Sequence, residues 1–372
     1  MAEVERRHVA VVLPPREGFG PQSAGAIALL QARLADPGSA PAGPFAVTVL
    51  GARQDGPVFP LPYVPVLDSW WPPGSDARYA AGLRRALLPL RPALIEVHNR
   101  PDLARRLAAW FPPQRIALFL HNDPRGMRGA KTAAHRSALS RRLGAVVCVS
   151  AFLARCWTEG TSGLPAPRVL PNCLDLCRLP PALAPEQRAP RIVFAGRLVA
   201  DKGADSFVAA CAEALPLLPG WEAVMIGADR FRPDSPETPF TEALRPRAQA
   251  AGVRLLGYQD HESVMVELSR AAIAVLPSRW QEPFGLAALE AMANGAALIA
   301  TRRGGLAELT EDVSVPIEAE DVAGIAQAIV GLARDPKRRA SLSQAGLERA
   351  RAYDLPAARR QLDQLRMELL RP

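Results

Sequence analysis

Lysine and long apolar runs are what this sequence most clearly lacks. Lys and Arg together number 45 in 372 residues, yet only Lys131, Lys202 and Lys337 are lysines. No stretch of about 18 uncharged apolar residues occurs, so the sequence predicts no transmembrane helix. Residues 1–15 contain acids and run straight into a strand-like segment, without the apolar core of a signal peptide. We therefore expect a cytoplasmic protein.

Several catalytic signatures are also missing. The sequence has no G-x-S-x-G motif, so the nucleophile elbow of the α/β-hydrolases is excluded. The cysteines are odd in number, and their spacing fits no zinc or redox pattern. Because no His/Cys cluster suits a metal either, we expect no metal site and treat the cysteines as buried small hydrophobic residues. They are Cys148, Cys156, Cys173, Cys177 and Cys211.

The surplus of positive charge is large but not diagnostic. The formal net charge is +8, and the bias toward arginine, with abundant Ala and Pro, can reflect the base composition of the source genome. No basic stretch is interleaved with aromatic residues, so we expect no nucleic-acid partner. Residues 125–142 carry six Lys and Arg side chains and no acid. They either contact an anionic membrane, at the inner face of the cytoplasmic membrane, or form a solvated helix face.

Short apolar runs alternate with helical segments along the chain. Runs rich in Val, Ile and Leu are typical of strands buried on both faces of a parallel sheet. Their alternation with helices predicts a doubly wound α/β fold. The predicted strands are 8–14, 45–51, 93–98, 115–121 and 145–150 in the first half, and 191–196, 221–227, 253–257, 271–277 and 297–301 in the second.

The chain is too long for one comfortable hydrophobic core, which favours two domains. The proline-rich segment 180–190 reads as a linker between them. We therefore predict two Rossmann-like domains, residues 1–180 and 190–350, facing a central cleft. Residues 355–372 have a helical period of their own. Ligands of open α/β sheets bind beyond the carboxyl ends of the strands, so the residues after each strand are the candidates for a site.

The strongest such candidate follows the predicted strand 271–277. Glu282 and Glu290 are separated by seven residues, and Gly285 lies at the start of a predicted helix. A helix N-terminus at a strand end offers free N–H groups to a diphosphate, and glycine allows its close approach. The alternative is a helix capped by an acid, with Glu290 on its solvated face.

A second cluster follows the predicted strand 191–196. Arg197 and Lys202 come directly after it. Arginine offers a planar fork and lysine a point charge to phosphate oxygens. The alternative is a solvated turn.

Three segments together carry a family resemblance: FAGRLVADKGADSF, EPFGLAALEAMANG and TRRGGLAEL. They are similar to the family 4 glycosyltransferases, which have the GT-B fold. The stretch LPNCLDL also resembles the family's Pro-Asn-Gly-Val-Asp turn, with Cys173 in place of the usual glycine. The resemblance covers the C-terminal half and is weaker in the N-terminal half.

The resemblance implies retaining transfer from a nucleotide-diphosphate sugar as co-substrate, with no cofactor and no obligatory metal. It implies that the C-terminal domain binds the donor and that the N-terminal domain binds the acceptor, with residues 355–372 packing back on the latter. Arg197 and Lys202 would stabilise charge developing on the diphosphate, and Glu282 would hold hydroxyls of the donor sugar. The further donor contacts that it implies are the N–H groups of Phe284, Gly285 and Leu286, with Glu290 on the ribose and Tyr258 at the nucleobase.

In the first half, three strand ends carry candidates. The loop with Gly20 resembles the family's glycine-rich loop near the donor phosphate, although it does not fit G-x-G-x-x-G. His121 ends the predicted strand 115–121, where the family places a histidine beside the donor sugar. His98 ends the strand 93–98, and Asp123 follows His121. We assign His98 and Asp123 to the acceptor; a histidine at a strand end is otherwise a structural hydrogen-bonding group.

The predicted function is therefore a glycosyltransferase of the hexosyl type that uses a glycan or lipid-linked acceptor in bacterial polysaccharide or lipopolysaccharide assembly. Two alternatives stay open: a nucleotide-sugar epimerase of the same fold, and a non-catalytic partner subunit. Glu282 and Glu290 superficially offer the carboxylate pair of a glycosidase. The phosphate-binding cations beside them favour a transferase instead.

Overall fold

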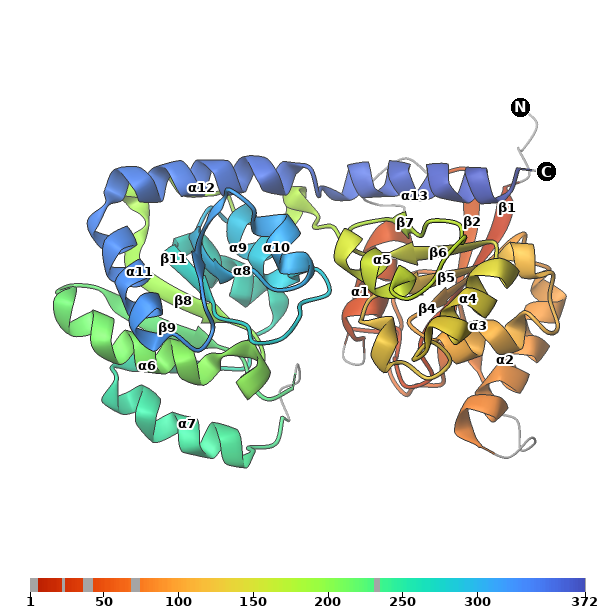
Figure 1. Cartoon of the computed structure of the whole chain (residues 1–372), viewed down its shortest axis with the longest axis horizontal. Helices are drawn as coiled ribbons and strands as arrows, with labels where there is room; N and C mark the ends of the chain where they lie inside the picture. Colours follow the sequence, from red (N-terminus) through yellow and green to blue (C-terminus); the bar gives the residue numbers. More distant parts are fainter. Residues whose placement is uncertain (1–5, 22–23, 36–42, 68–73, 231–234, 372) are drawn as a thin grey trace. The chain divides into compact units, whose positions relative to one another are not determined.

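A computed structural model describes residues 6–21, 24–35, 43–67, 74–230 and 235–371, and it divides the chain into two compact units. Unit 1 comprises Met1–Cys173 together with Leu355–Pro372, and unit 2 comprises Leu174–Asp354. Each unit is a parallel sheet with helices on its faces (Figure 1). The predicted α/β class and the two Rossmann-like sheets are confirmed.

The sheet of unit 1 has the order β3-β2-β1-β4-β5-β6-β7, and all of its neighbours are parallel. The order reverses direction between β1 and β4, which is the switch point where open α/β sheets bind their ligands. The strands are β1 (Arg7–Val12), β2 (Phe45–Ala52), β3 (Tyr63–Val66), β4 (Leu94–His98), β5 (Ile116–Leu120), β6 (Ala145–Cys148) and β7 (Arg168–Val169).

Helices cover the sheet of unit 1, and side chains cap several of them. The Ser150 hydroxyl accepts the N–H of Leu153, and the Thr132 hydroxyl accepts the N–H of His135, so both helices begin with a satisfied N–H group. The helices are α1 (Ala26–Ala35), α2 (Ser75–Leu90), α3 (Pro101–Leu107), α4 (Ala133–Arg142), α5 (Ala151–Thr158) and α13 (Leu355–Leu369).

The final helix, α13, belongs to unit 1, although it follows unit 2 in the chain. Its residues Leu362 and Leu365 join the core formed by the central strands and α1. Arg366 donates two hydrogen bonds to the Glu96 carboxylate of β4, at 2.8 and 2.9 Å. Both side chains are buried, so this ion pair ties the end of the chain to the middle of the first sheet.

The sheet of unit 2 has the order β10-β9-β8-β11-β12-β13, again all parallel. Its switch point lies between β8 and β11. The strands are β8 (Ala189–Ala195), β9 (Glu222–Ile226), β10 (Val253–Gly257), β11 (Ala271–Leu276), β12 (Ala297–Thr301) and β13 (Ser314–Ile317). The helices are α6 (Ala204–Ala214), α7 (Pro239–Ala250), α8 (His261–Arg270), α9 (Leu286–Ala293), α10 (Gly305–Thr310), α11 (Val322–Arg334) and α12 (Pro336–Arg351).

The whole predicted linker 180–190 lies within unit 2, which begins at Leu174, and this corrects the prediction that it joins two domains. Arg188 is buried, and its guanidinium donates to the backbone oxygens of four residues. A buried cation that is held by carbonyl groups fixes its own backbone, so this stretch packs rather than swings. The four acceptors are Leu183, Ser269, Ala271 and Asn294.

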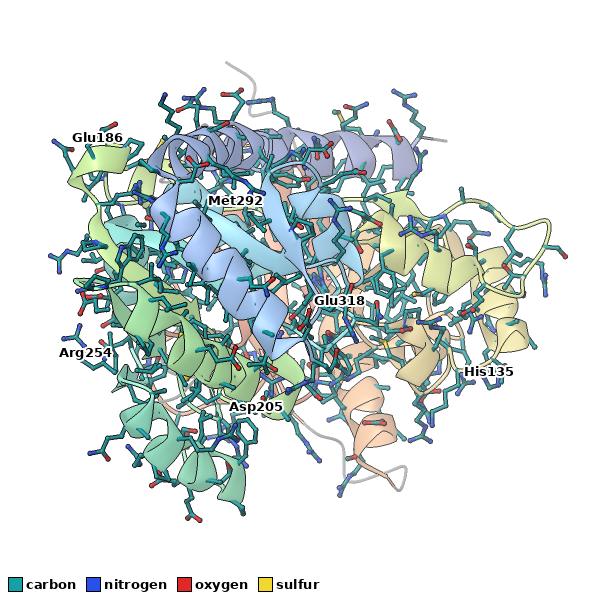
Figure 2. The ribbon with its side chains drawn as sticks, turned by 60° about the vertical axis from the view of Figure 1, so that its left-hand side comes forward. His135, Glu186, Asp205, Arg254, Met292 and Glu318 are labelled. Atoms are coloured by element: carbon teal, nitrogen blue, oxygen red, sulfur yellow. The ribbon has the colours of Figure 1, made fainter. Side chains whose placement is uncertain are left out.

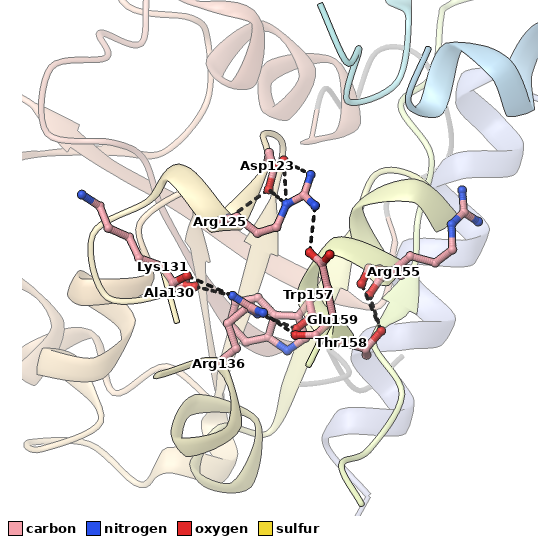
Figure 3. A network of polar contacts seen from close by, with 10 residues as sticks. Asp123, Arg125, Ala130, Lys131, Arg136, Arg155, Trp157, Thr158 and Glu159 are labelled. Carbon is pink, nitrogen blue, oxygen red and sulfur yellow. Dashed lines mark hydrogen bonds and ion pairs between the residues drawn. The ribbon is translucent and has the colours of Figure 1, made fainter. Parts of the chain in front are cut away.

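The basic segment 125–142 is less basic at its surface than its sequence indicates (Figure 3). Arg136 is buried, and it donates to the carbonyls of Trp157, Ala130 and Glu159 at 2.5–3.0 Å. The prediction that Arg136 belongs to a surface patch is therefore wrong, because its guanidinium caps backbone carbonyls instead. Arg125 is engaged as well, by the carboxylates of Asp123 and Glu159.

Exposed cations of the segment remain on α4 and the turn before it. The side chain of Arg128 is 71% exposed and makes one ion pair, with Asp76, at 3.3 Å. Lys131 and Arg141 are exposed, as is His135, which points away from α4 into solvent in Figure 2. An anionic surface that bound this segment would contact these exposed side chains.

Candidate functional site

The candidate donor site lies in unit 2, where the loops after β8 and β11 meet at the switch point of the sheet. Lys202 ends a short 3-10 turn after β8, and Glu282 lies in the loop after β11. The Lys202 Nζ donates to Glu282 Oε1 at 2.5 Å. The structure thus brings together two predicted site residues that are 80 positions apart in the sequence.

Ser278 is a third member of this cluster, and it was not predicted from the sequence. Its buried hydroxyl donates to Glu282 Oε1 at 2.8 Å. The backbone of Ser278 is itself held, because its carbonyl accepts the Thr301 hydroxyl of β12 at 2.9 Å. Glu282 is therefore held by one cation and one hydroxyl. A serine directly after a strand was the available signal, although serine is common in such loops.

The TRRGGLAEL segment positions the Glu282 backbone. The N–H of Gly305 donates to the Glu282 carbonyl at 2.6 Å. Gly304 has φ 65° and ψ −137°, a conformation that essentially only glycine adopts. A Cβ at Gly304 would lie 2.3 Å from the Glu282 carbonyl oxygen. This glycine lets two loops touch, so the motif acts on the site through Glu282 rather than through its arginines.

Gly285 begins α9 as predicted, with φ 103° and no side chain capping the helix. The N–H groups of the first turn, starting at Leu286, therefore have no acceptor within the helix. The ring of Phe284 is buried against Tyr353, with 5.6 Å between centroids. The aromatic side chain anchors the turn, so only the backbone of this residue is available to a ligand.

Glu290 lies one turn into α9, and His261 is its partner. His261 Nε2 lies 3.0 Å from Glu290 Oε1. The Glu290 side chain is 13% exposed, whereas that of His261 is 40% exposed. This contradicts the alternative that Glu290 lies on a solvated helix face. His261 was not predicted; the signal available was its position as first residue of α8, three residues after the predicted Tyr258 contact.

Two predicted donor residues remain without a side-chain partner in the part of the chain that the structure describes. Arg197 is half-buried in the loop after β8, where Gly196 packs so closely that a Cβ on Gly227 would meet its carbonyl at 1.9 Å. Tyr258 is half-buried directly after β10. Arg197 carries a charge at the switch point that no described carboxylate neutralises.

In unit 1 the two candidate histidines contact one another. His98 Nδ1 lies 2.9 Å from His121 Nε2. His98 is 1% exposed and stacks on Phe119, with 4.8 Å between ring centroids. Burial lowers the pKa of His98 to about 3, and the nearby positive charge of Arg366 acts in the same direction. Burial also lowers the pKa of His121 well below its ordinary value, so both rings are neutral.

The loops around the histidines are held by side chains. Asn99 has φ 58°, an unusual conformation for a residue other than glycine, and its Oδ1 accepts the N–H of His121 at 3.2 Å. Asp123 caps the turn that follows by accepting the N–H of Arg125. The Arg125 guanidinium lowers the pKa of Asp123, although partial burial opposes this effect. Asp123 is thus engaged within its own loop.

The described residues beside the glycine-rich loop of unit 1 make contacts within their own unit. Glu17 Oε1 accepts the N–H of Ala28 in the first turn of α1 at 2.8 Å. This carboxylate takes the place at the helix N-terminus that an anionic ligand would otherwise fill. Gly20 is required for close packing instead, because a Cβ there would lie 2.1 Å from the Pro57 carbonyl oxygen.

A pocket of about 300 Å³ opens at the switch point of unit 1. Asn99 and Arg100 contribute from the end of β4, and Asp76 and Arg128 contribute further charges. The Arg100 guanidinium donates to the Asn99 carbonyl and makes no ion pair with a described carboxylate. The apolar part of the lining comes from Pro15, Tyr79, Pro101, Leu103 and Met127.

The described residues offer neither a metal-binding cluster nor a membrane-spanning helix. Among them, no group of three or more His, Cys, Asp or Glu side chains is placed to hold a metal ion. No helix in the same part of the chain is long and apolar enough to cross a membrane.

Comparison with protein families supports the glycosyltransferase resemblance that the sequence predicts for the C-terminal half. Residues 179–349 match the family described as glycosyl transferases, group 1. The lipopolysaccharide core biosynthesis mannosyltransferase LpsB of Rhizobium meliloti is 34% identical over 160 residues, which cover 41% of this chain and 44% of the relative. The matched region thus spans less than half the length of the first curated relatives.

Solved structures match over nearly the whole chain. Sucrose-phosphate synthase from Thermosynechococcus elongatus matches with a TM-score of 0.78 and 21% identity, covering 98% of this chain and 99% of that chain. HepE of Anabaena, in complex with UDP and glucose, matches with a TM-score of 0.75 and 17% identity, covering 98% and 100%. These likenesses show the fold, which is the GT-B fold of two Rossmann-like domains.

Proposed function

We propose that this protein is a retaining glycosyltransferase, of the family 4 type, that transfers a hexosyl group from a nucleotide-diphosphate sugar to a glycan or lipid-linked acceptor. The observation that carries the proposal is the Lys202–Glu282 pair beside the uncapped start of α9 at the switch point of unit 2. Cations and free N–H groups suit a diphosphate, and a carboxylate suits sugar hydroxyls.

The roles of the residues follow from what each group can do chemically. Breaking the bond between sugar and diphosphate places negative charge on the leaving phosphate. Arg197 and Lys202 stabilise this charge, together with the N–H groups of Gly285 and Leu286, without a metal ion. Glu282 accepts hydrogen bonds from hydroxyls of the donor sugar. Glu290, held by His261, accepts hydrogen bonds from the ribose.

The acceptor binds in unit 1, in the pocket lined by Asn99 and Arg100. Its volume suits a sugar ring, and its mixture of charged and apolar side chains offers both hydrogen bonds and ring contacts. The names of the relatives favour cell-surface glycans, because LpsB is a lipopolysaccharide core mannosyltransferase. The acceptor class proposed is therefore a bacterial lipopolysaccharide or polysaccharide intermediate.

Peripheral membrane contact is part of this proposal, through the exposed cations Arg128, Lys131 and Arg141. The triple variant Arg128→Gln, Lys131→Gln, Arg141→Gln is expected to sediment less with vesicles of anionic phospholipid than the unchanged protein. Arg136 stays unchanged because it is buried. Equal sedimentation of the two proteins would remove membrane contact through this segment from the proposal.

A thermal-shift screen tests the donor. The full chain is heated with uridine, guanosine and adenosine diphosphate sugars, as wild type and as the variants Lys202→Met and Lys337→Met. A ligand that binds only the folded state raises the melting temperature. We expect one donor class to stabilise wild type and Lys337→Met, the exposed-lysine control, but not Lys202→Met. If no donor at millimolar concentration stabilises the wild type, the donor proposal fails.

Incubation with the stabilising donor alone then separates the enzyme classes. An epimerase converts the donor sugar without a second substrate, whereas a transferase leaves it intact or hydrolyses it slowly. A non-catalytic partner subunit binds the donor but neither converts nor hydrolyses it, and it transfers no sugar when glycan acceptors are added.

A further inference from the structure

The contact between His98 and His121 joins two ring nitrogens, so one proton must lie between them. His98 Nδ1 and His121 Nε2 are 2.9 Å apart. Two imidazole nitrogens at this distance form a hydrogen bond only when one of them carries a hydrogen and the other a lone pair. Because the proton's position is not visible in atomic coordinates, it has to be inferred from the surroundings of the other two nitrogens.

The other nitrogen of His98 is buried and without a partner. His98 Nε2 has no hydrogen-bond partner among the described residues. A water-sized cavity of about 20 Å³ lies nearby, lined by His121, Glu96 and Asn172, but His98 does not line it.

The other nitrogen of His121 is in a different situation. His121 is half-buried as a residue, and its Nδ1 is not among the buried polar atoms without a partner. Solvent or a ligand can satisfy this nitrogen whether it carries a hydrogen or a lone pair. The choice between the two arrangements is therefore decided at His98 Nε2 alone.

Burial disfavours a doubly protonated ring at both positions, because it lowers the pKa of His98 and of His121. Arg366 on α13 lies within electrostatic reach of His98 and opposes a positive charge there, while Glu96 on β4 is already held by Arg366 in two hydrogen bonds. Asp363, the second acid on α13, also pairs with Arg366. Each ring thus holds a single proton.

Of the two neutral arrangements, one buries an N–H with no acceptor and the other buries a lone pair with no donor. Among backbone groups, unpaired buried N–H donors are rarer than under-satisfied carbonyl acceptors, and the same preference disfavours a buried imidazole N–H with no acceptor. We propose that His98 Nδ1 carries the hydrogen and donates to His121 Nε2, so that His98 is a positioning residue that fixes His121 as the tautomer with a hydrogen on Nδ1. His121 then presents a rigid, neutral N–H donor at the end of β5, and no basic nitrogen.

The tautomer gives His121 a chemical role in ligand binding, and this role rests on the proposed function. A fixed N–H donor binds an acceptor oxygen of a ligand. It cannot remove a proton from an acceptor hydroxyl, because its only lone pair is occupied by His98. His98 itself has no surface to offer an acceptor, which replaces the acceptor contact predicted for it from the sequence.

Nuclear magnetic resonance of the full chain labelled with ¹⁵N-histidine tests the tautomers without any substrate. We expect both His98 and His121 to show a protonated Nδ1 and an unprotonated Nε2. These protonation states should stay the same between pH 8 and pH 5. Single substitutions of the histidines assign the signals. A His121 protonated on Nε2, or a titration of either ring in this range, would overturn the proposal.

Matched variants of His98 test whether it acts through His121. His98→Asn can place its side-chain amide N–H near the position of Nδ1, whereas His98→Leu removes the donor at similar size. We expect His98→Leu to free Nε2 of His121, so that this ring no longer keeps a single tautomer, and His98→Asn to restore the Nδ1-protonated tautomer at least in part. His135→Asn is the control. If His121 keeps its tautomer in His98→Leu, His98 does not position it.

An activity readout separates this inference from the proposed function. With a donor from the thermal screen, His98→Leu is expected to lower kcat more than it raises KM and to give the rate a new ionisation above pH 5. His98→Asn should recover the wild-type pH profile. If the protein has no transferase activity, the magnetic-resonance experiment still tests the tautomers, because it needs no substrate.

Discussion

Lys202 Nζ donates a 2.5 Å hydrogen bond to Glu282 Oε1, so the cation predicted for the diphosphate is neutralised by the acid predicted for the sugar. The two side chains are 25% and 13% exposed, which shields the pair only partly from solvent. A bound donor would place phosphate oxygens beside Lys202 and sugar hydroxyls beside Glu282. Donor binding must therefore redistribute the hydrogen bonds of this pair.

The first prediction concerns nucleoside diphosphates that lack the sugar. Removing the acid in Glu282→Gln leaves Lys202 free for phosphate, so affinity should rise by about fivefold, equivalent to ~1 kcal/mol. Lys202→Met should lower it by at least as much. Isothermal titration calorimetry with UDP, GDP and ADP measures both, with Lys337→Met as the control. A loss of affinity in Glu282→Gln would show that the acid itself holds the diphosphate.

Much of this site could be predicted from the sequence, for a physical reason. The carboxyl ends of parallel strands converge at the switch point, so residues placed after β8 and β11 had to come close. The sequence could not show Ser278 or His261, because a serine in a loop and a histidine at a helix start have many uses. It also placed His98 at the acceptor and Arg136 in a basic surface segment, whereas both are buried. Periodicity within a short segment does not indicate which face a distant element will cover.

The second prediction concerns the buried ion pair of α13. Arg366→Met leaves Glu96 as an unpaired buried acid and should cost about 3–5 kcal/mol of unfolding free energy. The double variant Glu96→Gln, Arg366→Met should recover part of that loss, since no charge remains buried. Urea unfolding followed by circular dichroism measures the difference. Arg360→Met, an exposed residue on the same helix, is the control and should change stability little.

The third prediction concerns Gly304. Alanine there would place its Cβ 2.3 Å from the Glu282 carbonyl oxygen in a strained conformation, and should cost about 1–3 kcal/mol. The shift of the Glu282 backbone should also weaken donor binding at temperatures where the variant is folded. Gly331 in α11 is the matched control, because a Cβ there meets no atom within 4 Å. Gly331→Ala should instead stabilise the helix by about 0.5–1 kcal/mol. Thermal unfolding of both variants with and without donor makes the comparison.

The last prediction concerns the dependence of stability on pH through His98. Burial lowers its folded-state pKa to about 3, whereas the unfolded chain has the ordinary value near 6.5. Between these values the unfolded state binds a proton that the folded state does not. The contribution of His98 to stability is therefore fully present above about pH 6.5 and is lost as pH falls towards 3.

One such proton makes the slope of stability against pH about 1.4 kcal/mol per pH unit well below pH 6.5. His98→Asn should reduce the slope by that amount between about pH 5.5 and 4, measured by urea unfolding at each pH, while the exposed control His135→Asn should leave it unchanged. An unaltered slope in His98→Asn would mean that His98 binds a proton in the folded protein, and it would then occupy a more polar environment than a buried ring stacked on Phe119.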